Sequence, residues 1–187
     1  MGHLARMSQP RRMDNLALIG FMGTGKSSVG HLVAAHLGFT FVDTDQLIEA
    51  QTGRSITDLF AHEGEAAFRA QERQVVQELA DRVKLVIATG GGLGADALNL
   101  ASLKTHALVV CLWASPEVIW QRVRHQTHRP LLNGPAPLAR LEELLARRAA
   151  IYREADVLMN TSQRQIREVA LQVAHEFQRA QRELTAR

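Results

Sequence analysis

The sequence predicts an α/β domain in which a mainly parallel β-sheet is covered by helices on both faces. Short apolar runs typical of buried strands alternate with helical patterns, and this alternation favours a parallel sheet. The apolar runs span residues 16–19, 39–42, 85–88, 107–112 and, more weakly, 157–159. The helical patterns span residues 26–37, 44–50, 56–79, 95–103, 116–124, 138–153 and 164–183. Ligands of such sheets bind at the carboxyl ends of the strands, so we expect a site in the residues that follow each run.

The first run leads into a phosphate-binding motif. Residues 20–27 read Gly-Phe-Met-Gly-Thr-Gly-Lys-Ser and match the P-loop pattern G-x-x-x-x-G-K-[ST] without a gap. A strand before the motif and a helix after it form the context in which this pattern binds phosphate. Lys26 would reach the β- and γ-phosphates, and the Ser27 hydroxyl would bind Mg²⁺. We therefore expect a nucleoside triphosphate site, with an unliganded glycine-rich turn as the alternative.

Two carboxylates follow the second run. Asp43 and Asp45 are separated by one residue, so on an extended segment they would point to the same side. Beside a P-loop, one of them could serve the metal and the other a substrate hydroxyl. The alternative is a structural role, because either residue could cap the helix that begins near Gln46. The two roles are compatible.

A triple glycine, Gly90-Gly91-Gly92, follows the third run. Each glycine costs backbone entropy on folding, so close approach of a ligand to the backbone explains three of them better than a tight turn does. The fourth run contains Cys111, which we interpret as a buried thiol, and is followed by Ser115 and Pro116, a typical start of a helix.

Three arginines on helical segments are further candidates. Arg69 lies three residues before Glu72, which suits either a solvated ion pair or a guanidinium held ready for a carboxylate. Arg147 and Arg148 precede Tyr152, and we expect one of the two to face the site and the other to face solvent.

The aperiodic segment 126–137 has the length of a lid, and its flanking histidines, His125 and His128, lack metal-ligand spacing.

Composition restricts the class of protein. A chain of 187 residues with 46% hydrophobic and 22% charged residues suits one soluble domain. It has no apolar run of the roughly 18 residues that span a bilayer, no secretory signal, and a single cysteine, so we expect a cytoplasmic protein. The net charge of +3 would allow a nucleic-acid partner, but part of this excess lies in the N-terminal arm. We expect neither a nucleic acid nor a membrane as partner.

Taken in order, these elements resemble the shikimate kinase family. The resemblance rests on G-x-x-G-x-G-K-S, Asp-Thr-Asp, Phe-Arg-x-x-Glu, Gly-Gly-Gly, Arg-Pro-Leu-Leu and Arg-x-x-x-Tyr, which together cover about residues 16–160. It implies a P-loop fold like that of the nucleoside monophosphate kinases, with a five-stranded parallel sheet flanked by helices. We accordingly expect a flexible arm at 1–14 and a single kinase domain at 15–187, with a substrate-binding subregion at about 44–80 and a mobile lid at about 124–137.

The resemblance also implies an activity. Shikimate kinases phosphorylate the 3-hydroxyl of shikimate with ATP and Mg²⁺, giving shikimate 3-phosphate and ADP in the biosynthesis of chorismate and the aromatic amino acids. By this resemblance the protein is a small-molecule phosphotransferase with shikimate and ATP as substrates and Mg²⁺ as cofactor. The family also implies a monomer.

Roles are carried over by position in the matching motifs. The implied ATP-binding residues are Gly23, Thr24, Gly25, Lys26, Ser27, Ser28, Arg122 and Arg129. The implied substrate-binding residues are Asp45, Arg69, Gly90, Gly91, Gly92 and Arg148, the last selected over Arg147 by alignment on Tyr152. Ser27 and Asp43 would serve Mg²⁺, Asp43 through water. Lys26, Asp45 and Arg129 would be catalytic, with Asp45 orienting or deprotonating the attacking hydroxyl.

Two other functions remain as alternatives. A related kinase acting on another polyhydroxy acid, such as gluconate, would share the P-loop, but the Asp-Thr-Asp and Gly-Gly-Gly elements together argue against it. A non-catalytic ligand sensor on the same fold is the alternative from another class. Such a regulator should carry a helix-turn-helix segment, and the short arm has no room for one.

Overall fold

The computed structural model describes residues 11–125 and 136–186. The strands are β1 (Asn15–Ile19), β2 (Thr40–Asp43), β3 (Leu85–Ala88), β4 (Ala107–Trp113) and β5 (Val157–Asn160). The α-helices are α1 (Lys26–Leu37), α2 (Thr44–Thr52), α3 (Ile56–Ala80), α4 (Ala97–His106), α5 (Pro116–Val123), α6 (Pro137–Tyr152) and α7 (Ile166–Thr185), and η1 (Leu93–Ala95) is a short 3₁₀ helix.

The five strands form one parallel sheet in the order β2-β3-β1-β4-β5, which confirms the predicted sheet. β1 is the central strand, between β3 and β4. Because all strands run the same way, their carboxyl ends meet at one edge. The chain passes from β1 towards β2 on one side and later returns to β4 on the other, so the segment after β1 lies at a topological switch point, where ligands of open α/β sheets bind.

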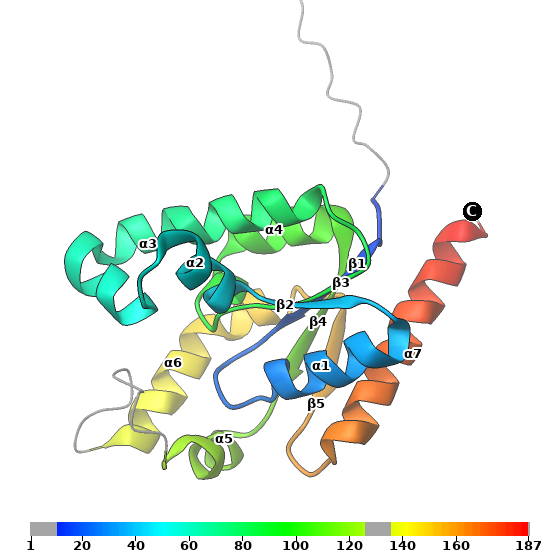
Figure 1. The fold of residues 1–187 in the computed structure, drawn as a ribbon. Helices are drawn as coiled ribbons and strands as arrows, with labels where there is room; N and C mark the ends of the chain where they lie inside the picture. The colour runs from blue at the N-terminus through cyan, green and yellow to red at the C-terminus, as the bar shows by residue number, and fades with distance from the viewer. Residues whose placement is uncertain (1–10, 126–135, 187) are drawn as a thin grey trace, which may run out of the picture.

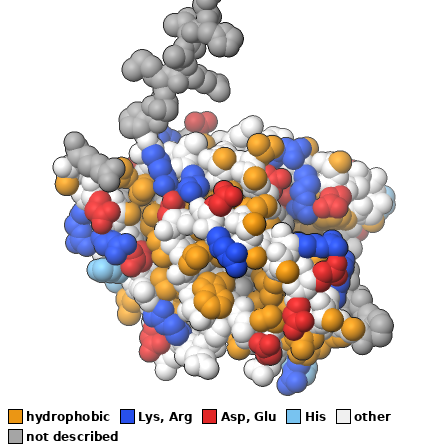
Figure 2. Space-filling model, turned by 180° about the vertical axis from the view of Figure 1, so that it is seen from behind, with side chains coloured by type: hydrophobic (Ala, Val, Ile, Leu, Met, Phe, Trp, Pro, Cys, Tyr) orange, Lys and Arg blue, Asp and Glu red, His pale blue; other side chains and the backbone are white. Residues whose placement is uncertain are grey.

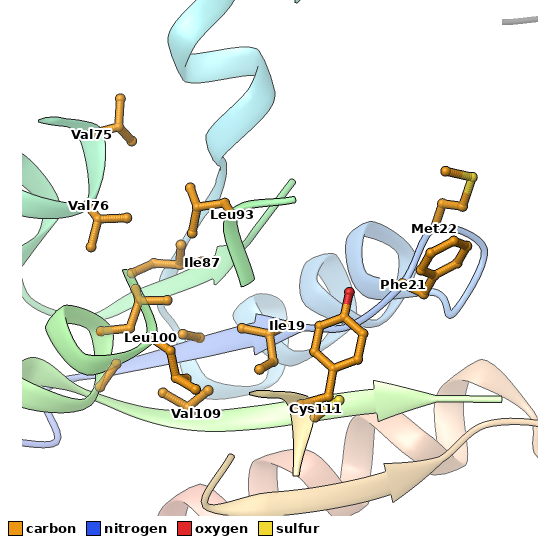
Figure 3. Close-up of a cluster of buried hydrophobic side chains, with 14 of the residues drawn as sticks. Ile19, Phe21, Met22, Val75, Val76, Ile87, Leu93, Leu100, Val109 and Cys111 are labelled. Carbon is orange, nitrogen blue, oxygen red and sulfur yellow. The ribbon is translucent and has the colours of Figure 1, made fainter. Parts of the chain in front are cut away.

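Helices cover both faces of the sheet (Figure 1). Residues of β1 alternate between the two faces: Leu16 and Leu18 pack with residues of α1 and α7, whereas Ala17 and Ile19 pack with residues of α3, α4 and α6. Figure 3 shows part of the second core, where Ile19 and Ile87 of the sheet lie near Leu93 and Leu100. The sheet is therefore buried on both faces, as expected for parallel strands.

Aspartate side chains cap the amino ends of α2 and α4. The second helix begins at Thr44, because Asp43 accepts hydrogen bonds from the N–H groups of Asp45 (3.0 Å) and Gln46 (3.4 Å). Asp45 is therefore on the first turn of α2, and Asp43 is its cap, which confirms the capping alternative. The two aspartates do not share an extended segment. Asp96 caps α4 in the same way, so the segment predicted as helix from residue 95 is helical from Ala97.

The first described residues contact the body of the protein. The Arg11 guanidinium pairs with the carboxylate of Asp156 and donates to the Ala107 carbonyl at 3.0 Å. The Arg12 N–H donates to the Thr105 carbonyl at 3.1 Å. The part of the predicted arm that the structure describes, residues 11–14, is thus hydrogen-bonded along the amino ends of the strands.

The surface carries charges of both signs. On the face seen in Figure 2, Lys and Arg side chains lie interspersed with Asp and Glu. Exposed ion pairs occur elsewhere in the described residues too, such as Arg54 with Glu63 at 2.7 Å. Among the helices of residues 11–125 and 136–186, none is long and apolar enough to cross a membrane.

Candidate active site

The P-loop connects the end of β1 with the first turn of α1. Gly20, Gly23 and Gly25 have positive φ angles of 135°, 74° and 98°, which side chains of L-residues resist. The Lys26 ammonium donates to the carbonyls of Gly20 and Phe21, each at 2.9 Å, so the loop curls around the lysine. The amino end of α1 adds backbone N–H groups and a positive helix dipole, which suits an anion such as a phosphate group.

This loop lines a cavity of about 700 Å³ at the carboxyl end of the sheet. Most of the residues predicted from sequence also line it, and they come from four separate segments. They are Gly23, Thr24, Gly25, Lys26, Ser27, Ser28, Asp43, Asp45, Gly90, Gly91 and Arg122. Arg69, Gly92 and Arg148 are absent from this lining. Gly92 ends the triple glycine, Arg69 lies against Gly92, and Arg148 donates to the Gly91 carbonyl.

Ser27 and Asp43 lie side by side in the cavity. The Ser27 hydroxyl donates to Asp43 Oδ2 at 3.1 Å, while Asp43 Oδ1 caps α2. A hydroxyl and a carboxylate are oxygen ligands of the kind that Mg²⁺ prefers. The described residues contain no cluster of three or more His, Cys, Asp or Glu side chains that could hold a metal. Mg²⁺ next to a nucleotide needs only one or two protein ligands, because phosphate and water oxygens complete its shell.

The triple glycine is required by two neighbouring side chains. A Cβ atom on Gly90 would lie 2.2 Å from Asp45 Oδ1, and one on Gly92 would lie 2.2 Å from Arg69 Nη1. Both distances are far below any van der Waals contact, so a side chain at either position would displace the predicted substrate residue. Asp45 and Arg69 thus give a reason for glycine at these two positions that the sequence pattern alone did not contain.

Arg69 is held by two carboxylates of its own helix. Its guanidinium bonds Glu72 at 2.7 Å and Glu65 at 2.9 Å. The Glu72 side chain is only 1% exposed, and its burial raises the pKa of its carboxyl although the Arg69 hydrogen bond and charge act in the opposite direction. The Arg69–Glu72 pair is therefore not the solvated surface pair that the sequence left open. It fixes a guanidinium next to Gly92.

The two arginines of α6 point to different surroundings. Arg147 is 65% exposed and pairs with Glu143 at 2.5 Å. Arg148 donates to the Gly91 carbonyl at 2.8 Å, and its guanidinium carbon lies 5.2 Å from the centre of the Phe21 ring. Arg148 therefore faces the triple glycine and the P-loop, and Arg147 faces solvent.

Arg122 of α5 joins the P-loop to the segment after β5. It donates to the Thr161 carbonyl at 2.6 Å and to the Gly23 carbonyl at 3.2 Å. Thr161, Arg164 and Ile166 also line the cavity, and the sequence analysis missed all three. They follow the fifth strand, so the rule applied to the earlier strands would have found them if it had been extended to the last.

Two further sequence predictions concern the lid segment and Cys111. Arg129 and His128 lie outside the described residues, as does most of the predicted lid. Cys111 is buried in β4, and burial raises the pKa of its thiol to about 12, so it is unreactive, as expected for a core cysteine.

The family-model comparison identifies one family. The model described as "SKI: Shikimate kinase" matches residues 22–178, which is most of the chain. A shikimate kinase from Thermodesulfovibrio yellowstonii is 43% identical over 167 residues, covering 89% of this chain and 96% of that protein. One from Thiobacillus denitrificans is 46% identical over 156 residues, covering 83% of this chain and 85% of the relative.

Solved structures give the same result. A shikimate kinase from Acinetobacter baumannii in complex with shikimate superposes with a TM-score of 0.84 at 38% identity, covering 90% of this chain and 94% of the other. A gluconokinase from Sinorhizobium meliloti has a TM-score of 0.58 at 18% identity, a likeness that shows a common fold alone. The family match, the high identity over nearly whole chains and the ordered site residues lead to one conclusion: the chain belongs to the shikimate kinase family.

Proposed function

We propose that the protein transfers the γ-phosphoryl group of ATP to the 3-hydroxyl of shikimate, giving shikimate 3-phosphate and ADP. One observation carries the proposal: a P-loop and a carboxylate, Asp45, line the same cavity beside two anchored arginines. The P-loop suits a phosphoryl donor. Asp45 and the two arginines suit a small hydroxy acid, because arginine binds a carboxylate and aspartate binds hydroxyls.

On the donor side, the N–H groups of the P-loop and the Lys26 ammonium would bind the β- and γ-phosphates. Lys26 already lies at the amino end of α1, where negative charge is favoured. Ser27 would bind Mg²⁺ directly and Asp43 through water. When bound, Mg²⁺ would neutralise charge on the phosphate oxygens. Gly23, Thr24, Gly25, Ser28 and Arg122 complete the part of the proposed nucleotide site that the structure describes.

On the acceptor side, Asp45 would hydrogen-bond the ring hydroxyls and orient or deprotonate the attacking one. Arg69 and Arg148 would bind the carboxylate at the other end of the ring, with Gly90, Gly91 and Gly92 offering backbone contacts. A rigid ring held at both ends needs little further ordering before reaction. This matters because phosphoryl transfer depends mostly on positioning and charge neutralisation.

We also propose a role for Arg129, an oligomeric state and a location, which are expectations from the sequence. Arg129 would move onto the transferring phosphoryl group as part of a lid that excludes water, which would otherwise accept the phosphate. The protein would act as a monomer. Its location would be the cytoplasm, with small-molecule substrates as its partners.

The test is ADP release from ATP and Mg²⁺, measured in parallel with shikimate, gluconate and no acceptor. We expect release that depends on shikimate, with shikimate 3-phosphate detected by phosphorus NMR. Release with gluconate alone would contradict the acceptor assignment and leave the P-loop chemistry intact. A folded protein that binds ATP but shows no acceptor-dependent release would indicate the ligand sensor instead.

A further inference from the structure

The two arginines proposed to bind the carboxylate are held by groups of different charge. Arg69 is paired with Glu72 and Glu65, so its positive charge is already compensated. Among residues 11–125 and 136–186, no carboxylate lies within ion-pair distance of Arg148. The contacts that hold Arg148 include a carbonyl oxygen and an aromatic face, both uncharged. Of these two arginines, Arg148 is therefore the one whose charge no carboxylate of the described residues compensates.

The first of these contacts is shared with a second residue of α6. Tyr152 follows Arg148 by one helical turn, and its hydroxyl donates to the same Gly91 carbonyl at 3.2 Å. A carbonyl oxygen has two lone pairs and can accept both hydrogen bonds. The Tyr152 side chain is buried, which raises the pKa of its phenol to about 12, so at neutral pH it stays protonated and remains a donor.

The second contact comes from the P-loop. Phe21 directly follows Gly20, and its ring is only 1% exposed. Figure 3 shows Phe21 and Met22 at the end of the core cluster where the chain leaves β1. The ring sits at a cation–π distance from the Arg148 guanidinium. A Cβ atom on Gly91 would be 3.8 Å from the Met22 nitrogen and 3.7 Å from Arg148 Nη1, so the glycine lies between the two segments.

We propose that Phe21 and Tyr152 are positioning residues that hold the Arg148 guanidinium in place for the carboxylate of the acceptor. Phe21 supports the guanidinium through its ring face, and Tyr152 fixes the carbonyl that the guanidinium binds. Because Phe21 belongs to the P-loop, this contact also connects the phosphate-binding segment to the carboxylate-binding arginine. The inference rests on the proposed function, which supplies the acceptor.

The test compares Phe21→Leu and Tyr152→Phe with the wild type by calorimetric binding and by steady-state turnover. We expect the Kd and KM for shikimate to rise about tenfold in Phe21→Leu, on the scale of a desolvated cation–π contact, and about threefold in Tyr152→Phe, on the scale of one neutral hydrogen bond. The kcat and the KM for ATP should stay within about twofold. Arg148→Ala gives, as a reference, the loss of shikimate affinity when the guanidinium is removed altogether. Arg147→Ala, on the exposed side of the same helix, is the matched control.

A second ligand separates positioning from general packing. The methyl ester of shikimate lacks the carboxylate charge, so the binding penalty of Phe21→Leu should fall to less than twofold with the ester. An equal penalty with acid and ester, or a parallel loss of ATP binding, would overturn the inference while the proposed function stands. A wild-type protein that neither binds nor phosphorylates shikimate would overturn the proposed function and this role for Phe21 together.

Discussion

The two ends of the sheet both carry buried or half-buried polar side chains, but these side chains make different contacts at each end. At the amino ends, Asn15 donates to the Arg82 carbonyl at 2.7 Å and accepts from the Leu85 N–H at 2.9 Å. Asp156 accepts from the Val109 N–H at 2.8 Å and pairs with Arg11. At the carboxyl ends, Lys26 and Asp45 line a cavity of about 700 Å³.

The difference separates stability from function. A polar group at the amino ends bonds a backbone group of a neighbouring segment, so its loss leaves a buried donor or acceptor without a partner. A polar group at the carboxyl ends can bond the backbone as well, as Lys26 does, but it also faces space that a ligand can occupy, so its loss is expected to change binding or catalysis. Substitutions at the carboxyl ends should thus alter turnover, and substitutions at the amino ends should alter unfolding.

The largest expected effect is at Lys26. In Lys26→Met the alkyl stem is retained and the ammonium is lost, so the charge that would stabilise the transferring phosphoryl group disappears. We expect kcat to fall by about 10²–10³-fold or more, the scale seen when a preorganised transition-state contact is removed. Steady-state ADP release measures the effect, and the midpoint of thermal unfolding serves as the control for folding. Turnover within tenfold of the wild type would remove Lys26 from its proposed role.

The next effect is at Gly92. In Gly92→Ala the new methyl would begin 2.2 Å from Arg69 Nη1, and the guanidinium must move. A displacement of about 1 Å in a positioning group can cost about 10²-fold, and Arg69 is flexible at its end, so we expect kcat/KM for shikimate to fall about 10–100-fold. The KM for ATP should change little. If both substrates lost affinity equally, the glycine would be serving the loop as a whole.

Lys26 and Gly92 also show what the sequence could and could not predict. The P-loop is a contiguous motif whose geometry comes from its own backbone, so Lys26 and Ser27 could be assigned from one short segment. Gly92 and Arg69 are 23 positions apart in the chain, and only the ordered set of family motifs brought them together. The reason for the glycine, a clash with a guanidinium from another helix, is a tertiary contact that no local pattern contains.

The amino ends were not predicted at all. Arg11 and Asp156 are separated by 145 positions, and neither belongs to a motif. A polar residue just before a strand is compatible with a turn, a cap or a solvated side chain, and periodicity does not distinguish these. The sequence analysis left Arg11 in a flexible arm for this reason.

Removal of the Asp156 carboxylate tests the amino ends directly. Asp156→Ala leaves the Val109 N–H and the Arg11 guanidinium without this acceptor. We expect the free energy of unfolding to fall by about 2–3 kcal/mol, the cost of an unsatisfied buried donor plus a lost charge-assisted bond. Urea unfolding measures the change, and kcat at a temperature well below the unfolding midpoint should equal that of the wild type. A loss of turnover without a loss of stability would contradict the division between the two ends.

The smallest effect concerns pH. His106 is 1% exposed at the end of α4, with Nδ1 3.1 Å from the Asn15 amide nitrogen. Burial lowers the pKa of its imidazole and Arg12 adds to this, while Asp14 and Asp81 oppose it. Below the ordinary histidine pKa of about 6.5, His106 therefore binds a proton more readily in the unfolded chain than in the folded one. The contribution of neutral His106 to folding stability is fully present above this pH and declines as the pH falls below it. Urea midpoints measured between pH 8 and pH 5 should show the decline in the wild type and a shallower one in His106→Gln. If the urea midpoints of the wild type and His106→Gln fell equally with pH, His106 would have the same pKa in the folded and unfolded states. The contact between Asn15 and His106 would then not depend on a neutral imidazole.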